Sequence, residues 1–418
     1  MVYSIFPPNS KEVKGDIQLP ASKSISNRAL IIHALSYAGE QIHNLADCDD
    51  TNVLVEALHS NARVFDIGAA GTAMRFLTAF LSKIVGEWVI TGSERMKQRP
   101  ISILVDALNK LGAHIEYMEK EGFPPLCIHG SALTGGKIEL DGSVSSQYIS
   151  ALLMIAPAMR DGLTLKLTGK IISKPYIYLT LKLMEDFGVK AVWADDVIII
   201  HPQEYKSVDY TIESDWSAAS YWYQLCALSQ KSEIKLLGLH KDSYQGDAKV
   251  AEIFSLLGVR TKFQKGEVIL TKSNELTNKL VYNFTDQPDL AQTIVVTCCF
   301  LQIPFRFSGL QSLKIKETNR VEALQNECRK LGFILEEPAE GILEWNGKRC
   351  EADPNPVIKT YEDHRMAMAF APACLKTGQI TIENPMVVTK SYPGYWGDLQ
   401  TVGLVISDKV ISDKGANH

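Results

Sequence analysis

The fold is decided by a stretch that reads Met184-Glu-Asp-Phe-Gly188-Val-Lys-Ala-Val-Trp193-Ala-Asp-Asp-Val197-Ile-Ile-Ile200. A glycine directly after a helical pattern adopts the left-handed conformation that ends the helix. The two apolar runs that follow are separated by a short polar turn, which is the pattern of a β-hairpin. This stretch therefore predicts the end of a helix, followed by two antiparallel strands.

The same helix-glycine pattern recurs along the chain at Gly112, Gly188, Gly258, Gly332 and Gly403, with spacings of 76, 70, 74 and 71 residues. A fixed period of this kind indicates an internal repeat whose units share a core. A weaker sixth copy ends at Ala62, 50 residues before Gly112, and leaves no room for a full hairpin. We expect six repeats, the first of them shortened.

A chain of 418 residues is too long for one hydrophobic core, so we expect two domains with three repeats each. The extended segments 14–20 and 207–214 are the natural crossings between them. The predicted division is a discontinuous domain of residues 1–20 plus 214–418, and an inserted domain of residues 21–213.

The composition excludes several classes of partner. A net charge of −5 argues against non-specific binding to nucleic acid or to an anionic membrane. The N-terminus lacks the pattern of a secretory signal, and the apolar run 148–159 falls short of the ~20 residues that cross a bilayer. The eight cysteines contain no C-x-x-C pair, which favours reduced thiols over a metal or disulfides. We expect a cytoplasmic protein with a small-molecule ligand.

Seven short blocks contain cations, small hydroxyl residues or glycines of the kind that is typical of a site for a small polyanion. These blocks are Lys23-Ser-Ile-Ser-Asn-Arg28, Gly71-Thr-Ala-Met-Arg75, Arg95-Met-Lys-Gln-Arg99, Ser145-Ser-Gln147, Lys316-Glu-Thr-Asn-Arg320, His364-Arg365 and Lys390-Ser-Tyr-Pro. Each block alone fits an ordinary interpretation, such as a capped helix start or a solvated charge run. The spacing of Lys316 and Arg320 also fits an i,i+4 pair on one face of a surface helix.

Taken together and in order, the blocks resemble the 5-enolpyruvylshikimate-3-phosphate synthase family. The resemblance rests on Leu19-Pro-Ala-Ser-Lys-Ser-Ile-Ser-Asn-Arg-Ala-Leu30, Ala70-Gly-Thr-Ala-Met-Arg75, Met96-Lys-Gln-Arg-Pro-Ile101, Gly142-Ser-Val-Ser-Ser-Gln147, Ser173-Lys-Pro-Tyr176, Lys316-Glu-Thr-Asn-Arg320 and Asp363-His-Arg-Met-Ala-Met368. It implies an α/β (α+β) fold, a two-domain inside-out α/β barrel of βαβαββ repeats. It also implies transfer of the enolpyruvyl group of phosphoenolpyruvate to the 5-hydroxyl of shikimate 3-phosphate, with no cofactor and no metal.

The resemblance assigns a role to each candidate residue. Lys23, Asp289 and Glu317 would be the catalytic residues. Shikimate 3-phosphate would be bound by Ser24, Arg28, Ser145, Ser146, Gln147, Ser173, Tyr176 and Lys316. Phosphoenolpyruvate would be bound by Gly71, Thr72, Arg99, Arg320, His364, Arg365 and Lys390, together with Lys23. Because these cations are divided between the two predicted domains, we expect domain closure on binding.

Three positions depart from the family's usual pattern. Ala69 and Ser312 stand where asparagine is common, and Phe76 stands where proline is frequent. Two other functions fit the motifs less well. The related UDP-N-acetylglucosamine enolpyruvyl transferases usually carry a reactive cysteine on a cleft loop, and the region 95–99 has none. A non-catalytic sensor of the same metabolites would not need Lys23, Asp289 and Glu317. We expect a monomeric enzyme with two small-molecule substrates and no nucleic-acid or membrane partner.

Overall fold

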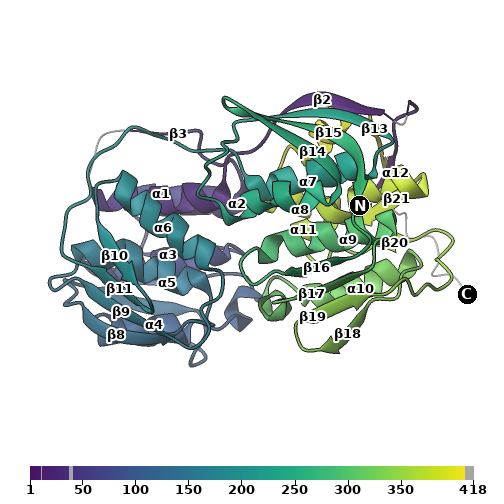
Figure 1. Cartoon of the computed structure of the whole chain (residues 1–418). Coiled ribbons are helices and arrows are strands. Elements are labelled where there is room, and N and C mark those ends of the chain that lie inside the picture. The colour runs from purple at the N-terminus through teal and green to yellow at the C-terminus, as the bar shows by residue number, and fades with distance from the viewer. Residues whose placement is uncertain (11, 37–40, 410–418) are drawn as a thin grey trace, which may run out of the picture. The chain divides into compact units, whose positions relative to one another are not determined.

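The computed structural model describes residues 1–10, 12–36 and 41–409. The chain forms two compact units. Unit 1 comprises Met1–Pro20 and Ser214–His418, and unit 2 comprises Ala21–Glu213. Unit 2 is therefore an insertion, and Figure 1 shows the purple N-terminal strand β2 (Glu12–Gln18) beside the much later strand β13 (Lys231–Leu237).

A βαβαββ pattern organises unit 2. One copy consists of β8 (Gly136–Asp141), α5 (Ser146–Ile155), β9 (Leu163–Thr168), α6 (Lys174–Asp186), β10 (Ala191–Ala194) and β11 (Val197–Ile200). Its sheet has the order β10-β11-β9-β8, with β8 and β9 parallel and the other neighbours antiparallel. The second copy consists of β4 (Val64–Asp66), α3 (Gly71–Lys83), β5 (Gly86–Thr91), α4 (Ser102–Lys110), β6 (His114–Tyr117) and β7 (Leu126–Gly130), and its sheet has the equivalent order.

The first repeat of unit 2 is shortened, as the sequence predicts. It consists of α1 (Lys23–Ser36), β3 (Ile42–His43) and α2 (Asp49–His59), and β3 pairs in parallel with β12 (Tyr210–Thr211). Within the described residues this sheet has two strands, whereas the other sheets have four. The missing part is the terminal hairpin.

Unit 1 contains three copies of the same pattern. The first is β2, α7 (Trp216–Leu228), β13, α8 (Val250–Ser255), β14 (Leu257–Gln264) and β15 (Glu267–Leu276). The second is β16 (Leu280–Asn283), α9 (Ala291–Leu301), β17 (Phe305–Ser308), α10 (Arg320–Lys330), β18 (Glu336–Ala339) and β19 (Ile342–Trp345). The third is β20 (Val357–Ile358), α11 (His364–Phe370), α12 (Cys374–Thr377), β21 (Ile380–Glu383), α13 (Tyr395–Thr401) and β22 (Val405–Lys409). Its sheet is completed by the N-terminal strand β1 (Val2–Phe6), which pairs with both β21 and β22.

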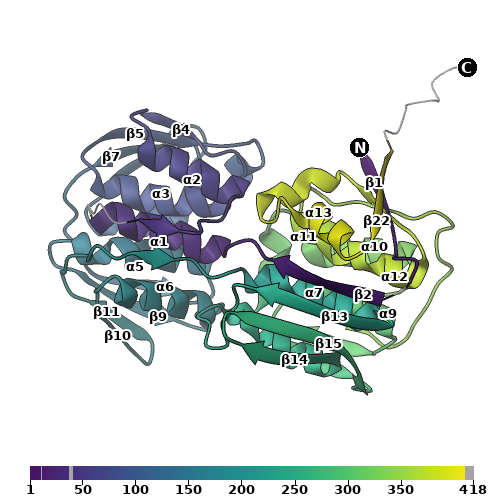
Figure 2. The ribbon, with the colours of Figure 1, turned by 90° about the horizontal axis from the view of Figure 1, so that it is seen from above.

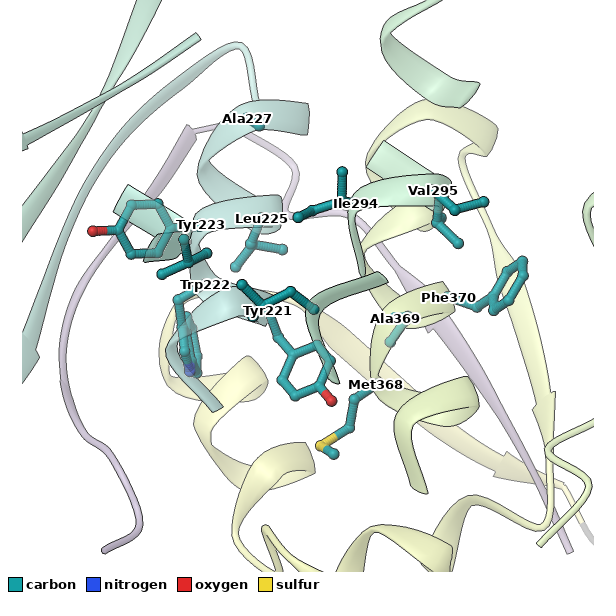
Figure 3. Packing of buried hydrophobic residues seen from close by; sticks show 14 of the residues in the cluster. Tyr221, Trp222, Tyr223, Leu225, Ala227, Ile294, Val295, Met368, Ala369 and Phe370 are labelled. Atoms are coloured by element: carbon teal, nitrogen blue, oxygen red, sulfur yellow. The ribbon is translucent and has the colours of Figure 1, made fainter. Parts of the chain in front are cut away.

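The core of unit 1 is built around helices, and the sheets lie outside them (Figure 2). Helices α7, α9 and α11 pack against one another, and all seven residues of α11 are buried. Figure 3 shows side chains of all three helices meeting, among them Tyr221, Ile294 and Met368. A helix that is buried on every side meets solvent only at its ends, so the polar groups that it can offer to a ligand lie there. This arrangement is the inside-out α/β fold that the family resemblance implies.

The five repeat glycines all have left-handed backbones, with φ between 79° and 100°. After Gly188 the chain forms the predicted antiparallel hairpin of β10 and β11. Gly258 differs in detail, because α8 ends at Ser255 and Gly258 lies at a register shift inside β14. The glycine there makes a β-bulge and does not end the helix.

The chain passes between the units twice, and backbone hydrogen bonds join the two passages within each unit. In unit 2, the Ser22 amide donates to the Glu213 carbonyl at 2.8 Å. In unit 1, the Asp215 amide donates to the Pro20 carbonyl at 2.9 Å.

Two further findings bear on the surroundings of the protein. Among the described residues, no helix combines the length and the apolar character that crossing a membrane requires. The eight cysteines are free thiols, most of them buried.

We predict that Gly188→Ala destabilises the protein by about 1–2 kcal/mol, because its φ of 84° places an added Cβ in the disfavoured left-handed region. Gly397→Ala is the matched control, since Gly397 lies within α13 and an added Cβ would contact nothing within 4 Å. That change should be neutral or stabilise by about 0.5–1 kcal/mol. Urea unfolding of both variants measures the difference, and equal stabilities would contradict the role of the repeat glycine.

Candidate functional site

The predicted site residues lie mainly at or just before the N-termini of helices. In unit 2 they occupy the starts of α1, α3, α5 and α6, and Arg99 follows the short 3-10 helix η1 (Met96–Gln98). In unit 1 they lie in η4 (Pro288–Leu290), in the segment before α10, at the start of α11 and at the end of η7 (Pro385–Lys390). Each unit therefore carries its own set of candidate residues.

Lys23 begins α1, and its Nζ forms an ion pair with Asp50 Oδ2 at 3.1 Å. Asp50 lies in the first turn of α2 and is almost fully buried. The pair holds the ammonium group of Lys23, whose side chain is 17% exposed, at the end of its helix. Asp50 was not among the residues predicted from the sequence, because it is distant in the chain and carries no motif.

Arg28 lies one turn further along α1 and is buried. Its guanidinium donates to Thr180 Oγ1 at 2.7 Å, to Ser150 Oγ at 3.0 Å and to the Ser24 carbonyl at 2.9 Å. These acceptors are neutral, and burial lowers the pKa of Arg28 to about 10. Phe76, one of the departures from the family pattern, places its ring 5.3 Å from the guanidinium carbon. A cation buried among neutral groups is well suited to bind a carboxylate or phosphate.

The start of α3 lies against Arg99. A Cβ added to Gly71 would come within 2.6 Å of Arg99 Nη1, so any other residue there would force the guanidinium to move away from the start of α3. The next residue, Thr72, accepts a hydrogen bond from Gln147 Nε2 at 3.2 Å, which joins the start of α3 to that of α5. Three predicted blocks thus meet within unit 2.

Hydroxyl groups mark the starts of α5 and α6. Ser145 caps α5 by accepting from the Gln147 amide at 3.3 Å, and Ser146 is nearly buried behind it. Ser173 precedes α6 with a left-handed backbone, φ 54°, and Tyr176 lies in the first turn. A helix N-terminus has free amide groups and a partial positive charge, both of which favour anions. Together with Lys23, Arg28 and Arg99, these helix starts form an electropositive set.

Arg320 organises the candidate residues of unit 1. Its guanidinium is 2% exposed and donates to Asp363 Oδ2 at 2.6 Å, to Glu317 Oε2 at 2.9 Å and to Asp289 Oδ1 at 3.1 Å. Burial alone lowers the pKa of Arg320, but the three carboxylates outweigh it, so the pKa lies above its usual value. The buried charge is therefore fully compensated.

The two predicted acid/base residues each bridge two cations. Asp289 also contacts Arg365, whose Nη2 lies 3.1 Å from Asp289 Oδ2. Glu317 also contacts Lys390, with 2.9 Å between Lys390 Nζ and Glu317 Oε1. Both carboxylates are thus held by pairs of cations, and neither is free to rotate without breaking an ion pair.

The structure corrects one expectation in this region. Helix α10 begins at Arg320, so Lys316 lies before the helix and the two cations do not share a helical face. Arg320 is moreover buried and not part of a surface pair. His364, the first residue of α11, is 1% exposed.

Two carboxylates of unit 1 were missed by sequence reasoning. Asp363 caps α11 by accepting from the Arg365 amide at 2.9 Å, and it also binds Arg320; an acid at a helix start is too common to stand out in the sequence. Asp247 is buried and accepts a hydrogen bond from Ser217. Burial, together with the charge of Asp289, raises the pKa of Asp247 to about 7.

The two sets of residues offer complementary chemistry. Unit 2 supplies cations, hydroxyls and helix N-termini, which bind anionic groups. Unit 1 supplies carboxylates held among cations, which can accept and return protons within hydrogen-bonding distance of a bound reactant.

The matching family model and the similar curated proteins agree on one family, and a solved structure shares its fold. The family model described as EPSP synthase (3-phosphoshikimate 1-carboxyvinyltransferase) matches residues 8–62 and 56–399. A 3-phosphoshikimate 1-carboxyvinyltransferase of Bacteroides fragilis (strain YCH46) is 58% identical over 407 residues, which cover 97% of this chain and 99% of the relative. A 3-phosphoshikimate 1-carboxyvinyltransferase of Vibrio cholerae serotype O1 (strain M66-2) is 36% identical over 413 residues, which cover 92% of this chain and 96% of the relative. The EPSP synthase structure from Acinetobacter baumannii superposes with a TM-score of 0.77 at 20% identity, covering 97% of this chain and 100% of that one.

We predict that Asp363→Asn destabilises the protein by about 3–5 kcal/mol, because it leaves the buried Arg320 without its closest carboxylate. Glu336→Gln is the control, since it removes one partner of an exposed ion pair with Lys348 and should change stability little. Chemical unfolding distinguishes the two. A small effect of Asp363→Asn would show that Glu317 and Asp289 compensate Arg320 by themselves.

Asp247 gives a prediction about pH. Because its folded-state pKa of about 7 lies above the value of 3.8 that is usual for an aspartate, the folded state holds its proton more tightly than the unfolded state. Its contribution to stability is therefore full below pH ~4 and falls as the pH rises to ~7. Asp247→Asn mimics the protonated form. We therefore expect its free energy of unfolding to fall less than that of the wild type as the pH rises across this range. Identical pH profiles for the two proteins would contradict the raised pKa.

Proposed function

The chain belongs to the EPSP synthase family, and we propose that the two sets of residues described above are the substrate-binding and catalytic residues of its reaction. That reaction transfers the enolpyruvyl group of phosphoenolpyruvate to shikimate 3-phosphate and releases phosphate, in the shikimate pathway to the aromatic amino acids. One observation carries the assignment of roles. Asp289 and Glu317, the candidate proton-transfer groups, each lie in ion pairs with cations assigned to phosphoenolpyruvate.

Shikimate 3-phosphate is assigned mainly to unit 2. Ser24 and Arg28 bind its carboxylate. Because the hydrogen-bond partners of Arg28 are neutral, its positive charge can be compensated by this carboxylate. Its phosphate is bound by the hydroxyls at the starts of α5 and α6 (Ser145, Ser146 and Ser173), with Lys316 of unit 1. Gln147 and Tyr176 border the ring. A phosphate carries about −1.5 to −2 charges, so hydroxyls, helix N-termini and one ammonium group together form a suitable site.

Phosphoenolpyruvate is assigned to cations of both units. Lys23, Gly71, Thr72 and Arg99 come from unit 2, and Arg320, His364, Arg365 and Lys390 come from unit 1. The fit of Gly71 against Arg99 supports this assignment, because it places a guanidinium beside the free amides at the start of α3. A ligand with a carboxylate and a phosphate needs several charge-assisted hydrogen bonds, which these groups supply.

The chemistry consists of addition and then elimination. The 5-hydroxyl of shikimate 3-phosphate attacks C2 of phosphoenolpyruvate while C3 gains a proton. The tetrahedral adduct then loses a proton from C3 and expels phosphate. Asp289 orients the hydroxyl and accepts its proton. Glu317 exchanges the proton at C3, and the ammonium group of Lys23 interacts with the bridging oxygen of the phosphate. Cations on either side of Asp289 and Glu317 stabilise the charge that develops in the transition state.

The assay that tests the activity measures phosphate release from the two substrates together. Release that requires both supports the enolpyruvyl transfer. Release with UDP-N-acetylglucosamine in place of shikimate 3-phosphate, or none at all, would contradict it.

A cytoplasmic location and a monomeric state complete the proposal. The free thiols support a reducing compartment, because exposure to an oxidising one favours disulfides. Light scattering of the purified protein tests the monomeric state.

Arg99→Ala should weaken phosphoenolpyruvate binding roughly ten- to a hundredfold, while shikimate 3-phosphate binding changes little. The loss corresponds to one charge-assisted contact of about 1.5–3 kcal/mol. Arg95→Ala is the matched control, because Arg95 is exposed in the same segment. Titration with each substrate measures the effect, and an equal loss for both substrates would overturn the assignment.

Glu317→Gln should leave both substrates bound but slow the reaction steeply, since an amide keeps the shape and loses the proton exchange. Incorporation of solvent deuterium into the methylene group of phosphoenolpyruvate reports that step directly. Glu322→Gln, an exposed acid in the first turn of α10, provides the control. Exchange at the wild-type rate in Glu317→Gln would transfer the role to Lys23.

A further inference from the structure

A group of potential metal ligands lies on the exposed face of a sheet in unit 2 and includes none of the residues assigned to the substrates. His114 and Glu116 lie on β6, and His129 lies on the neighbouring strand β7. His114 is paired directly with His129 in the antiparallel register. Strands β5 and β7 of this sheet are labelled in Figure 2.

The three side chains are close enough to share one ion. One potential ligand atom from each lies within 4.8 Å of the others. His114 Nε2 lies 2.9 Å from Glu116 Oε1, and the two imidazole rings are stacked with 4.6 Å between their centroids. Ligands of a tetrahedral Zn²⁺ ion lie ~3.3 Å apart, given metal bonds of ~2.0–2.1 Å. His114 and Glu116 are exposed and His129 is half-buried, so binding requires rotation about their side-chain bonds to bring the three atoms to that separation.

The backbone beneath the cluster is fixed. Ile115, between His114 and Glu116, is buried, so its neighbours point to the opposite face. The Ile115 amide donates to Asn109 Oδ1 at 3.0 Å, and Asn109 Nδ2 donates to the Ile115 carbonyl at 3.2 Å. Asn109 at the end of α4 thus fixes the backbone of edge strand β6. Only the side chains of the ligands have to become ordered when an ion binds.

A fourth side chain supports the same site from the other side. Glu87 of β5 is paired in register with His129, and its carboxylate lies 3.8 Å from His129 Nδ1. This contact is longer than a hydrogen bond; a closer approach of the carboxylate to that ring nitrogen would orient the histidine so that its other nitrogen can bind a metal. His129 Nε2 itself lies 3.8 Å from Cys127 Sγ, so binding of an ion replaces that weak contact.

We propose that His114, Glu116 and His129 bind a divalent late first-row transition ion of the Zn²⁺ class, with water completing the coordination. Two imidazoles and one carboxylate form a ligand set that suits Zn²⁺ and not Mg²⁺ or Ca²⁺, which prefer oxygen ligands. The ion links β6 to β7 through side chains, so it stabilises the outer hairpin of the repeat. It takes no part in the proposed transfer reaction.

Calorimetric titration of the full chain with ZnCl₂ tests the proposal, using His114→Ala, His129→Ala and a control variant. His43→Ala is the matched control, because His43 is also an exposed histidine of unit 2 paired with an acid, Asp209. We expect one zinc ion to bind the wild type and His43→Ala alike, and binding to weaken roughly tenfold or more in each of the other two variants. Equal affinity in all four proteins would overturn the proposal.

Thermal unfolding supplies a second readout. Zinc should raise the melting temperature of the wild type, EDTA should reverse the rise, and neither His114→Ala nor His129→Ala should respond. Glu116→Gln provides a further variant at the same site. Phosphate release at the wild-type rate without zinc shows that the variants fold. An unchanged zinc response in them would contradict the proposed ligands.

Discussion

Arg320 can remain charged in the interior of unit 1 only because the carboxylates of Asp289, Glu317 and Asp363 surround it. An isolated buried charge would cost several kcal/mol, so these acids and this cation require one another. The acids come from η4, from the segment before α10 and from the cap of α11. One guanidinium thereby fixes the relative positions of three helix starts. Lys390 and Arg365 are held in turn by Glu317 and Asp289.

Unit 2 is built from the same repeat, but it carries different residues at its helix starts. Its inner helices have serine or glycine at or next to their first residue, and Arg28 hydrogen-bonds to neutral oxygens. In both units the buried helices of the βαβαββ repeat have polar residues at their N-termini. The same architecture can therefore present anion-binding groups, as in unit 2, or carboxylates, as in unit 1. In the proposed mechanism the first kind anchors the substrates and the second transfers protons. This division follows from the residues at the helix starts and not from the topology, which the units share.

The fold class was predictable from the sequence because the repeat is marked locally, by a glycine and a hairpin that need no distant partner. The shortened first repeat was predictable for the same reason. The family motifs also located the candidate residues, although their roles stay predictions. Pairings such as Lys23 with Asp50, or Arg320 with Asp363, were not predictable, since each joins segments far apart in the chain. The expectation of a helical turn from Lys316 to Arg320 was wrong, because Asn319 caps α10 and starts the helix later.

Strand β1 lies between β21 and β22 in its sheet, and β2 lies beside β13. During synthesis on the ribosome, the first twenty residues therefore emerge long before any of their partners exist. Unit 2 is translated next and has all its own strands, so it can fold while the N-terminal strands wait. The last sheet of unit 1 closes only when β22, near the end of the chain, has been made. A truncated chain released before that point would expose an unfilled sheet edge, which quality-control proteases and chaperones can recognise.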